Sequence, residues 1–493
     1  MYRELLKRTG TYSLAGLTTR AASFLMLPVY TRFLSPADYG VMELLDLTTT
    51  IVGLLLGARV GSAVFYYYFA ASSPREKDEC IGNVFFFAIG LGIAIAAITL
   101  PAAGLLSSLV FGTPQYVSYF RLLFLALACS LPVEAGFSCV RAFNEPALFV
   151  RLTVAQIIFS IVLNVLFLAV FHMGVSGMLT TGLITTAVLA VFMSWLILSP
   201  RKLTIKPRTI FQMFGYCLPL GLSGLAVFVI HYGDRVLLRR TVSLSDLGVY
   251  ALSYKLGMLI AFVHAPYNLH WTSQVCDIVK APGGDRIFVR STTVLVSVLI
   301  FATLLLALFS ELLVKVMAGP AFSAASALVP WLGAAYLIRA IGAHLQSVFT
   351  LEGRPALELK VNAIGSLACL VGYATLIPRY KLWGAVGATL LGFGVILVYS
   401  FWEAQRLRPF PFEYQKLLRI CFFAMLSAAG FFALRPVNLW LQAGIALMCA
   451  MMFPAAVFLF CLNVDERSYV VAGAIRLYRG GSPEIEEAQE VSV

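Results

Sequence analysis

The chain has 493 residues, of which 60% are hydrophobic and only 12% are charged. Soluble domains average about 25% charged residues, so this composition excludes an ordinary soluble protein and indicates a protein of the lipid bilayer. The formal net charge is +12. Because membrane proteins retain Lys and Arg on their cytoplasmic side, we attribute this charge to topology and to the membrane surface, and expect no nucleic-acid partner.

Apolar segments long enough to cross a hydrocarbon core of roughly 30 Å recur along the whole chain. We expect about fourteen transmembrane helices, and hence an all-α polytopic membrane protein. The first apolar segment is too long for the core of a signal peptide and lacks a small-residue cleavage site, so we expect it to be the first helix. The expected spans are 10–32, 40–69, 81–106, 118–142, 147–171, 175–198, 209–233, 246–274, 290–313, 323–350, 356–377, 382–404, 415–434 and 438–463.

One short motif occurs twice, about 208 positions apart, each time between two apolar segments. Its copies are Ser35-x-x-Asp38-x-Gly40-Val41 and Ser243-x-x-Asp246-x-Gly248-Val249. We expect each copy to form a helix cap or an Asp-initiated loop. Three further pairs keep the same order and nearly the same spacing: Gly10-x5-Gly16-Leu17 with Gly215-x5-Gly221-Leu222, Pro146-Ala147-Leu148 with Pro355-Ala356-Leu357, and Gly174-x2-Gly177-x4-Gly182 with Gly384-x2-Gly387-x4-Gly392.

These pairs indicate a duplicated unit of about six helices, and an even number of helices inserts both copies with the same orientation. We expect a first lobe at 1–200 with helices 1–6, a second lobe at 201–404 with helices 7–12, two added helices at 405–463 and a partly disordered tail at 464–493. The basic segment 199–208 is the expected connector between lobes. Roughly 23 of the 36 Lys and Arg residues fall on the face of the N-terminus, so we expect both termini in the cytoplasm.

The sequence lacks the short motifs that support covalent chemistry. It contains no G-x-x-x-x-G-K-S/T phosphate loop, no H-E-x-x-H zinc motif and no G-x-S-x-G elbow. Its nine cysteines lie in or beside apolar segments without C-x-x-C spacing. We therefore expect a transporter that is not an enzyme, with no cofactor and no metal site.

Ionisable side chains within the spans are the candidate functional residues, because each costs about 2.5–3.5 kcal/mol on insertion scales unless it is paired or faces water. Arg20 and Arg59 are open to two interpretations: a buried pair with Glu134 or Asp46 that fixes helix packing, or an anion site in a central cavity. Lys255 and Arg339 are candidates for the same cavity, or for local pairing or snorkelling. The proposed substrate-binding set is Arg20, Arg59, Lys255 and Arg339.

The second candidate group would serve ion coupling or gating. Glu134 is the clearest acid in mid-membrane, while Asp46, Asp234 and Arg235, and also Glu43, which is not in the candidate group, lie closer to the outer ends of their spans. The alternative for Asp234 and Arg235 is an adjacent pair at the membrane interface. The repeat does not reproduce these charges at equivalent positions, so we expect the function to depend on what the two lobes do not share.

With the repeated motif, the two lobes and the added helices assembled, the chain resembles the polysaccharide or O-antigen flippases of the multidrug/oligosaccharidyl-lipid/polysaccharide exporter superfamily. The resemblance is carried by 27–40 (LPVYTRFLSPADYG) and by Asp234-Arg235 ahead of 243–250, and it covers roughly residues 5–460. It implies a V-shaped pair of helix bundles in the bacterial inner membrane. By alternating access these bundles would pass a polyprenyl-diphosphate-linked oligosaccharide to the outer leaflet for cell-surface polysaccharide biosynthesis.

The implied substrate agrees with the excess of cations, since a diphosphate needs positive charge and Arg offers bidentate donors. The lipid-linked glycan and membrane lipid are therefore the expected partners, with a polysaccharide polymerase and chain-length proteins as further candidates. Three alternatives are open. A multidrug or cation antiporter of the same superfamily typically needs an acid in its first helix, where this chain has Arg20. A membrane-integral glycan polymerase or ligase usually needs a sizeable outer loop, and a structural partner of a glycan-assembly complex would not transport.

Overall fold

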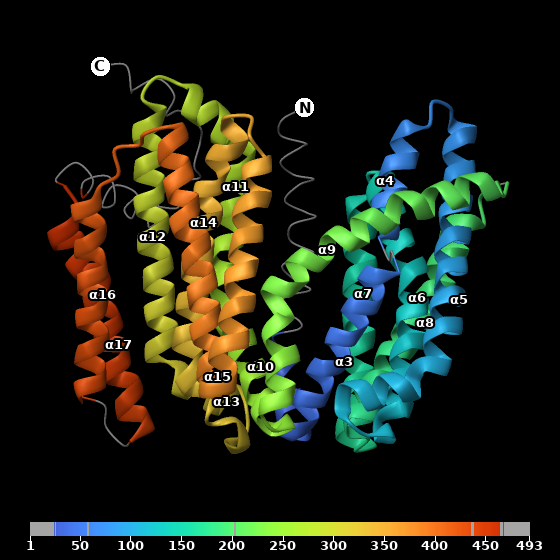
Figure 1. Ribbon diagram of the computed structural model, residues 1–493, viewed down its shortest axis with the longest axis horizontal. Helices are drawn as coiled ribbons and strands as arrows, with labels where there is room; N and C mark the ends of the chain where they lie inside the picture. The colour runs from blue at the N-terminus through green and yellow to red at the C-terminus, as the bar shows by residue number, and fades with distance from the viewer. Residues whose placement is uncertain are drawn as a thin grey trace.

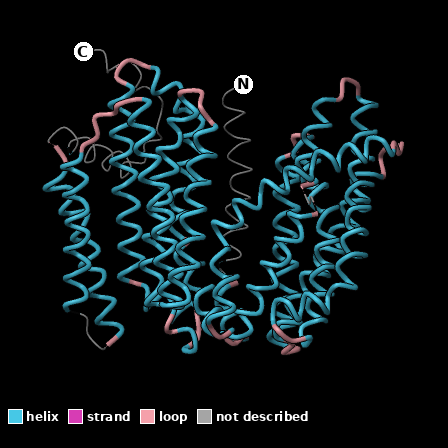
Figure 2. The backbone as a smooth tube through the Cα atoms, in the orientation of Figure 1, coloured by secondary structure: helices cyan, strands magenta, loops and turns pink. Residues whose placement is uncertain are grey.

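The computed structural model describes residues 24, 26–56, 59–201, 204–434, 438–463 and 467. Within these ranges the regular structure is helical and no strand occurs (Figure 2). The all-α fold is therefore confirmed. The helices are α2 (Leu27–Phe33), α3 (Pro36–Leu55), α4 (Val60–Ala70), α5 (Pro74–Phe111), α6 (Val117–Ala142), α7 (Pro146–Val165), α8 (Gly174–Leu198), α9 (Pro207–Thr241), α10 (Leu244–Gly257), α11 (Leu259–Lys280), α12 (Gly284–Leu308), α13 (Ser310–Met317), α14 (Ala325–Leu351), α15 (Ala356–Leu407), α16 (Tyr414–Leu434) and α17 (Leu439–Ala456).

Eleven helical segments in the described ranges are long and apolar enough to cross a membrane. The expected number was about fourteen. α15 joins two expected spans across a kink at Lys381, whose φ of 51° is not helical. α9 has 35 residues but carries several charges and is not among the eleven. Since the expected span 10–32 lies mostly outside the described residues, the count of fourteen stays a prediction.

The helices form two groups that lie side by side (Figure 1). One group contains α3 to α8, and the other contains α10 to α15 with α16 and α17 at its far edge. α9 runs obliquely from the first group toward the second. Its first half packs Met213 and Cys217 into the core of the first group, while its second half adds Leu238 to the central core. The expected lobe boundary at residue 200 therefore precedes a helix that contacts both groups.

The repeated motif begins the corresponding helices of the two groups. Ser35 Oγ accepts a hydrogen bond from the Asp38 N–H at 3.2 Å, and Asp38 Oδ2 accepts one from the Ser35 N–H at 3.0 Å. This reciprocal pair is a capping box. Ser243 Oγ likewise accepts from the Asp246 N–H at 3.1 Å. The expected helix cap is present in both copies, with the serine as the capping residue and the aspartate three residues later.

The glycine of each motif copy allows α3 and α10 to cross in close contact. A Cβ atom on Gly40 would lie 2.1 Å from the carbonyl oxygen of Leu244, and one on Gly248 would lie 1.8 Å from that of Pro36. Each carbonyl belongs to the first turn of the opposite helix, so the contact is reciprocal and leaves no room for a side chain. We call the end of the bundle where α3 and α10 begin the motif end, and the opposite end, which holds residues 199–201 and 204–208, the connector end.

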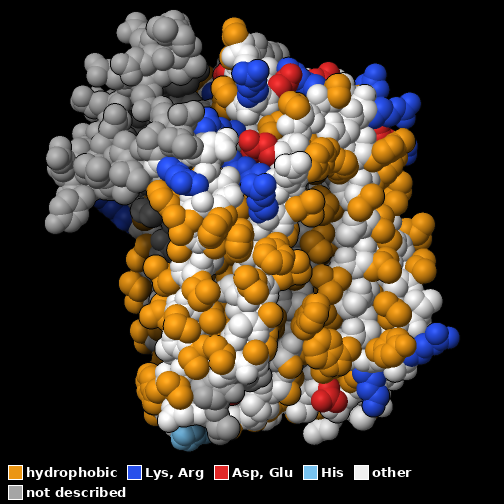
Figure 3. All heavy atoms as spheres, turned by 90° about the vertical axis from the view of Figure 1, so that its left-hand side faces the viewer, with side chains coloured by type: hydrophobic (Ala, Val, Ile, Leu, Met, Phe, Trp, Pro, Cys, Tyr) orange, Lys and Arg blue, Asp and Glu red, His pale blue; other side chains and the backbone are white. Residues whose placement is uncertain are grey.

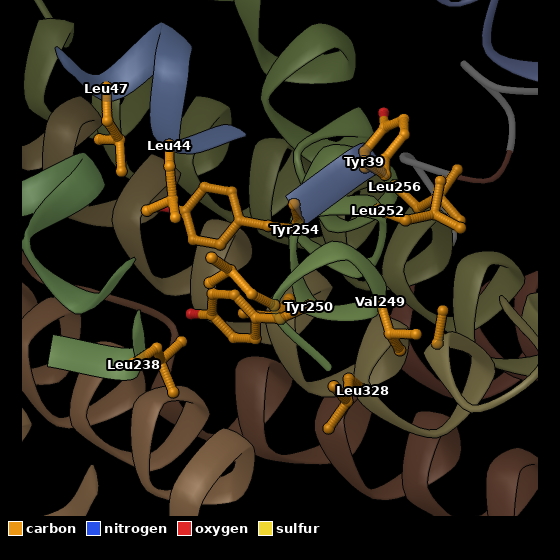
Figure 4. Close-up of a cluster of buried hydrophobic side chains, with 14 of the residues drawn as sticks. Tyr39, Leu44, Leu47, Leu238, Val249, Tyr250, Leu252, Tyr254, Leu256 and Leu328 are labelled. Atoms are coloured by element: carbon orange, nitrogen blue, oxygen red, sulfur yellow. The ribbon is translucent and has the colours of Figure 1, made fainter. Parts of the chain in front are cut away.

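Apolar side chains surround this crossing and join the two groups into one central core. Figure 4 shows a cluster drawn from α3, α9, α10 and α14. Its labelled members are Tyr39, Leu44, Leu47, Leu238, Val249, Tyr250, Leu252, Tyr254, Leu256 and Leu328. All of them are buried. The contact between the groups at the motif end is therefore a packed hydrophobic interface and is not confined to the two glycines.

The surface agrees with a membrane location. Figure 3 views the molecule from the side of α16 and α17 and shows a broad band of hydrophobic side chains, with Lys and Arg mostly at the connector end. Ion pairs join the connector to the first turns of α5 at this end. Arg201 pairs with Asp78 at 2.9 Å, and Lys206 pairs with Glu79. The charged and apolar regions thus separate along the bundle axis, as the sequence predicted for a multi-pass membrane protein.

Replacing Gly248 with alanine should separate α3 from α10, because the new Cβ atom would overlap the Pro36 carbonyl. Overpacking of this kind costs about 1–3 kcal/mol, so the purified variant should unfold several degrees below the parent in a thermal scan. Gly90→Ala is the matched control, since a Cβ atom at that α5 position meets nothing within 4 Å. Equal melting temperatures for the two variants would show that α3 and α10 do not need this contact.

Candidate functional site

Among the predicted site residues that the structure describes, Asp234 and Arg235 form buried ion pairs and the others form none. Arg20 lies outside the described residues. The other seven lie on α3, α6, α9, α10 and α14 or just before α4. They are Asp46 on α3, Arg59 before α4, Glu134 on α6, Asp234 and Arg235 on α9, Lys255 on α10 and Arg339 on α14.

Arg235 is the centre of a buried ion network that joins α9 to α3. Its Nε donates to Glu43 Oε1 at 2.6 Å, and its Nη1 donates to Asp234 Oδ1 at 2.9 Å. Asp234 Oδ2 accepts a hydrogen bond from the Tyr250 hydroxyl at 2.5 Å. The guanidinium also lies over the Tyr254 ring, 4.1 Å from its centroid. Only 2% of Arg235 is exposed, so its charge is compensated by protein groups and not by water.

This arrangement resolves where the Asp234 and Arg235 side chains lie. They do form an adjacent ion pair, but both are buried among helices and neither is exposed at a membrane interface. Glu43 on α3 completes the network of Arg235 on α9. It was not among the predicted site residues. The sequence carried a weak signal for it, an acid within an apolar span, but 192 positions separate Glu43 from Arg235. Whether Asp234 and Arg235 act in gating stays a prediction.

Lys255 and Asp46 line a cavity of about 250 Å³ between α3 and α10. Lys255 Nζ donates to the Tyr39 hydroxyl at 3.0 Å and lies 4.7 Å from the centre of that ring. In the described part of the chain, neither Lys255 nor Asp46 forms an ion pair. Both side chains nevertheless remain exposed to the cavity. The cavity therefore holds one ammonium group and one carboxylate that are not directly neutralised by a neighbour.

Glu134 holds the start of α4 in place. Its Oε1 accepts a hydrogen bond from the Gly61 N–H at 2.9 Å, which satisfies one of the free backbone donors of the first turn. Arg59 precedes this turn and is exposed, while its carbonyl oxygen accepts from Cys217 Sγ on α9. Across the described residues Arg59 has no ion pair, so the paired alternative with Glu134 or Asp46 is not observed.

Arg339 lies half-buried in the middle of α14. Its Nη1 is buried and has no hydrogen-bond partner among the described residues. An unsatisfied charged donor in a membrane span is costly, and such groups are usually completed by a partner, water or a ligand. Among the predicted site cations that the structure describes, Arg339 is therefore the one with a buried donor that lacks an acceptor.

The structure does not place all the predicted cations around one described cavity. The cavity between α3 and α10 is lined by Lys255 but by neither Arg59 nor Arg339. Arg59 lies beside the first half of α9, where its Nη2 would be 2.9 Å from a Cβ atom on Gly224. The three cations thus do not line one described cavity, and whether they bind one ligand stays a prediction.

Comparison with known proteins places this arrangement in context. The sequence profile of the polysaccharide biosynthesis protein family matches residues 29–327. No curated protein sequence matches the chain.

Solved structures of membrane transporters share the fold. The lipid II flippase MurJ in an inward closed conformation has a TM-score of 0.70 at 12% identity, over 91% of this chain and 98% of that one. An inward-facing multidrug resistance MATE family transporter of the MOP superfamily has a TM-score of 0.65 at 14% identity, over 79% and 95%. A MOP superfamily transporter from Pyrococcus furiosus, described by the reverse polarity of its binding pocket, has a TM-score of 0.54 at 15% identity, over 81% and 94%. At these identities the matches establish the fold alone.

Removing the cation of the buried network should be strongly destabilising. Arg235→Met would leave Glu43 and Asp234 as buried carboxylates without a cation, a change that costs about 3–5 kcal/mol. Adding Glu43→Met to that variant should recover part of the loss, because one of the uncompensated charges is removed. The measurement is a double-mutant cycle on the free energy of unfolding in mixed micelles.

The control for this cycle is a pair that water already solvates. Arg75 and Glu79 lie 3.4 Å apart on α5, and the Arg75 side chain is 88% exposed. Pairs of this kind contribute about 0–1 kcal/mol, so Arg75→Met should have a small effect. A coupling energy between Glu43 and Arg235 no larger than that of the control pair would contradict the assignment of a buried network.

Proposed function

The chain belongs to the polysaccharide biosynthesis protein family, and we propose that it is a flippase for a polyprenyl-diphosphate-linked oligosaccharide. The fold that it shares with transporters, the lipid II flippase among them, supports this proposal. The substrate would pass from the cytoplasmic to the outer leaflet of the bacterial inner membrane. Its glycan would then serve cell-surface polysaccharide synthesis, with a polymerase and chain-length proteins as candidate partners.

The proposed orientation places the connector end in the cytoplasm and the motif end outside. It is supported by the concentration of basic side chains at the connector end, since positive residues are retained on the cytoplasmic side. The short connection at the motif end between α5 and α6 supports a transporter over a polymerase or ligase, because it offers no room for an outer catalytic domain. The chain ends themselves lie outside the described residues.

In this orientation the structure represents a state that is closed toward the outside. Two contacts support that assignment, the crossing of α3 and α10 at Gly40 and Gly248 and the ion pair between Glu43 and Arg235. Alternating access would require both contacts to separate when the substrate leaves. Because α9 contacts both groups, we propose that it carries the movement of one lobe to the other.

The observation that carries the substrate assignment is the unsatisfied guanidinium of Arg339 in mid-membrane. A diphosphate supplies several acceptor oxygens and enough negative charge to complete such a group. Arg59 and Lys255 have no ion pair within the described ranges and would bind the same headgroup at other points along its path. Arg20 completes the proposed set, although it lies outside the described residues.

Asp46 supports a separate role for the small cavity. Its carboxylate faces the same space as Lys255 and pairs with no described cation. Such an acid suits binding of a proton or a metal cation during the transport cycle. We propose that Asp46 couples ion movement to the opening of the motif end, while Glu134 keeps its structural contact with α4.

Arg339→Gln should slow transport of lipid-linked oligosaccharide, since it removes the proposed charge-assisted bonds to the diphosphate. The loss of such a bond, about 1.5–3 kcal/mol, corresponds to a decrease of about tenfold or more in the initial rate. The measurement is transfer of the fluorescent-labelled lipid between leaflets of proteoliposomes. Arg59→Gln and Lys255→Gln should also lower the rate of transport.

Arg121→Gln is the matched control because Arg121 is exposed near the start of α6 and does not line the cavity between α3 and α10. It should transport at the parental rate. If Arg339→Gln inserted and folded normally and also kept that rate, the anion-binding role of Arg339 would be wrong. If the parent moved organic cations but no lipid-linked glycan, the antiporter alternative would replace the proposed function.

A further inference from the structure

A second pocket, of about 570 Å³, lies at the motif end between α3, α5 and α9. Its wall is mostly apolar and includes Leu44, Leu47, Ile51 and Val236. Its charged side chains are Arg239 and Arg240, which lie in the last turn of α9. None of the residues proposed to bind the transported substrate lines this pocket.

Arg239 holds a half-buried position with incomplete hydrogen bonding. Its Nη2 donates to the carbonyl oxygen of Phe111 at 2.7 Å, which fixes the guanidinium against the end of α5. Its Nε is buried and has no partner among the described residues. Because buried polar groups are normally satisfied, a donor of this kind indicates a missing acceptor.

Arg240 adds a second positive charge beside the first. Its side chain is exposed and has no hydrogen bond or ion pair within the described part of the chain. Basic residues in the last turn of a helix also favour the helix dipole, an effect of about 0.3–1 kcal/mol. The dipole accounts for a cation near the end of α9, but it supplies no acceptor to the buried Nε of Arg239.

The surroundings of the pocket are those of a membrane surface. Leu109 and Val236 line it and are 76% and 43% exposed, and Leu105 lies one turn before Leu109 and is 72% exposed. Such side chains face hydrocarbon in a membrane protein. A ligand that fits both parts of the pocket therefore needs an anionic group for the two guanidiniums and a hydrocarbon chain for the wall.

We propose that this pocket binds the phosphate group of a membrane lipid through Arg239 and Arg240, with the hydrocarbon chain along the apolar wall. Arg guanidinium groups bind phosphate oxygens in bidentate fashion, which would satisfy the Nε of Arg239. In the proposed orientation the site faces the outer leaflet. Arg239 lies one turn after Arg235, so a bound lipid would also brace α9 against α3 where the buried network joins them. Lipid binding at this pocket does not depend on transport, so this proposal goes beyond the proposed function.

The test is direct binding to the purified full-length chain in detergent. The probes are phosphatidylglycerol, a polyprenyl diphosphate and inorganic phosphate, each titrated separately and detected by native mass spectrometry. Arg240→Gln and the double variant Arg239→Gln/Arg240→Gln should bind the lipid probes about tenfold or more weakly than the parent. Arg379→Gln should bind them as the parent does, because Arg379 is exposed beside the α15 kink and does not line the pocket.

The lipid probe that binds more tightly identifies the source of the phosphate, a bulk phospholipid or a lipid-linked intermediate. If Arg240→Gln and the double variant bound the lipids with the affinity of the parent, the proposed site would be wrong. It would also be wrong if inorganic phosphate bound to the parent as tightly as both lipids. Arg240 is exposed and makes no described hydrogen bond, so its variant tests the site without disturbing the fold. Lipid binding at this pocket does not require flipping. A chain that binds lipid here but transports no glycan would therefore contradict the proposed function and leave the lipid site unaffected.

Discussion

The reciprocal crossing of α3 and α10 is the constraint on which the rest of the structure depends. Two glycines, one from each copy of the repeated motif, let each helix approach the first-turn carbonyl of the other. Helices in a membrane gain little from excluding water, so close van der Waals contact of this kind is a principal source of their association. The crossing brings Glu43 within reach of Arg235 and places Asp46 and Lys255 around one cavity. The two copies of the motif thus supply the contact, and charges that the copies do not share lie around it.

The charges differ in how completely the protein compensates them. Arg235 has two carboxylates and an aromatic ring, and it is removed from water. A buried pair gains little net stability because desolvation offsets much of the attraction, but separating its members is costly. Such a network favours one relative position of the two groups over others. Arg339, by contrast, keeps a buried donor without an acceptor in the described chain, which is the property expected of a residue that binds an anion transiently.

The sequence predicted the features that are local or periodic. Apolar segments located the helices, and the Ser-x-x-Asp pattern located the caps of α3 and α10 because a capping box involves residues three positions apart. It did not predict that Gly40 and Gly248 meet, or that Glu43 reaches Arg235, since those contacts depend on how the two groups pack. Nor did hydropathy reveal the break before Val60 within the expected span 40–69, where the Glu134 carboxylate holds the first turn of α4.

The distance between the two groups at the motif end during transport shows directly whether α3 and α10 separate. Thr113 and Ser323 are exposed at this end in different groups. Spin labels on cysteines at these positions, in a background without reactive native cysteines, would report their separation in liposomes. We expect one short distance in the resting protein and an added longer distance when lipid-linked oligosaccharide is supplied. An unchanged distance distribution while the labelled protein transports its substrate would contradict the claim that the contact of α3 with α10 must open.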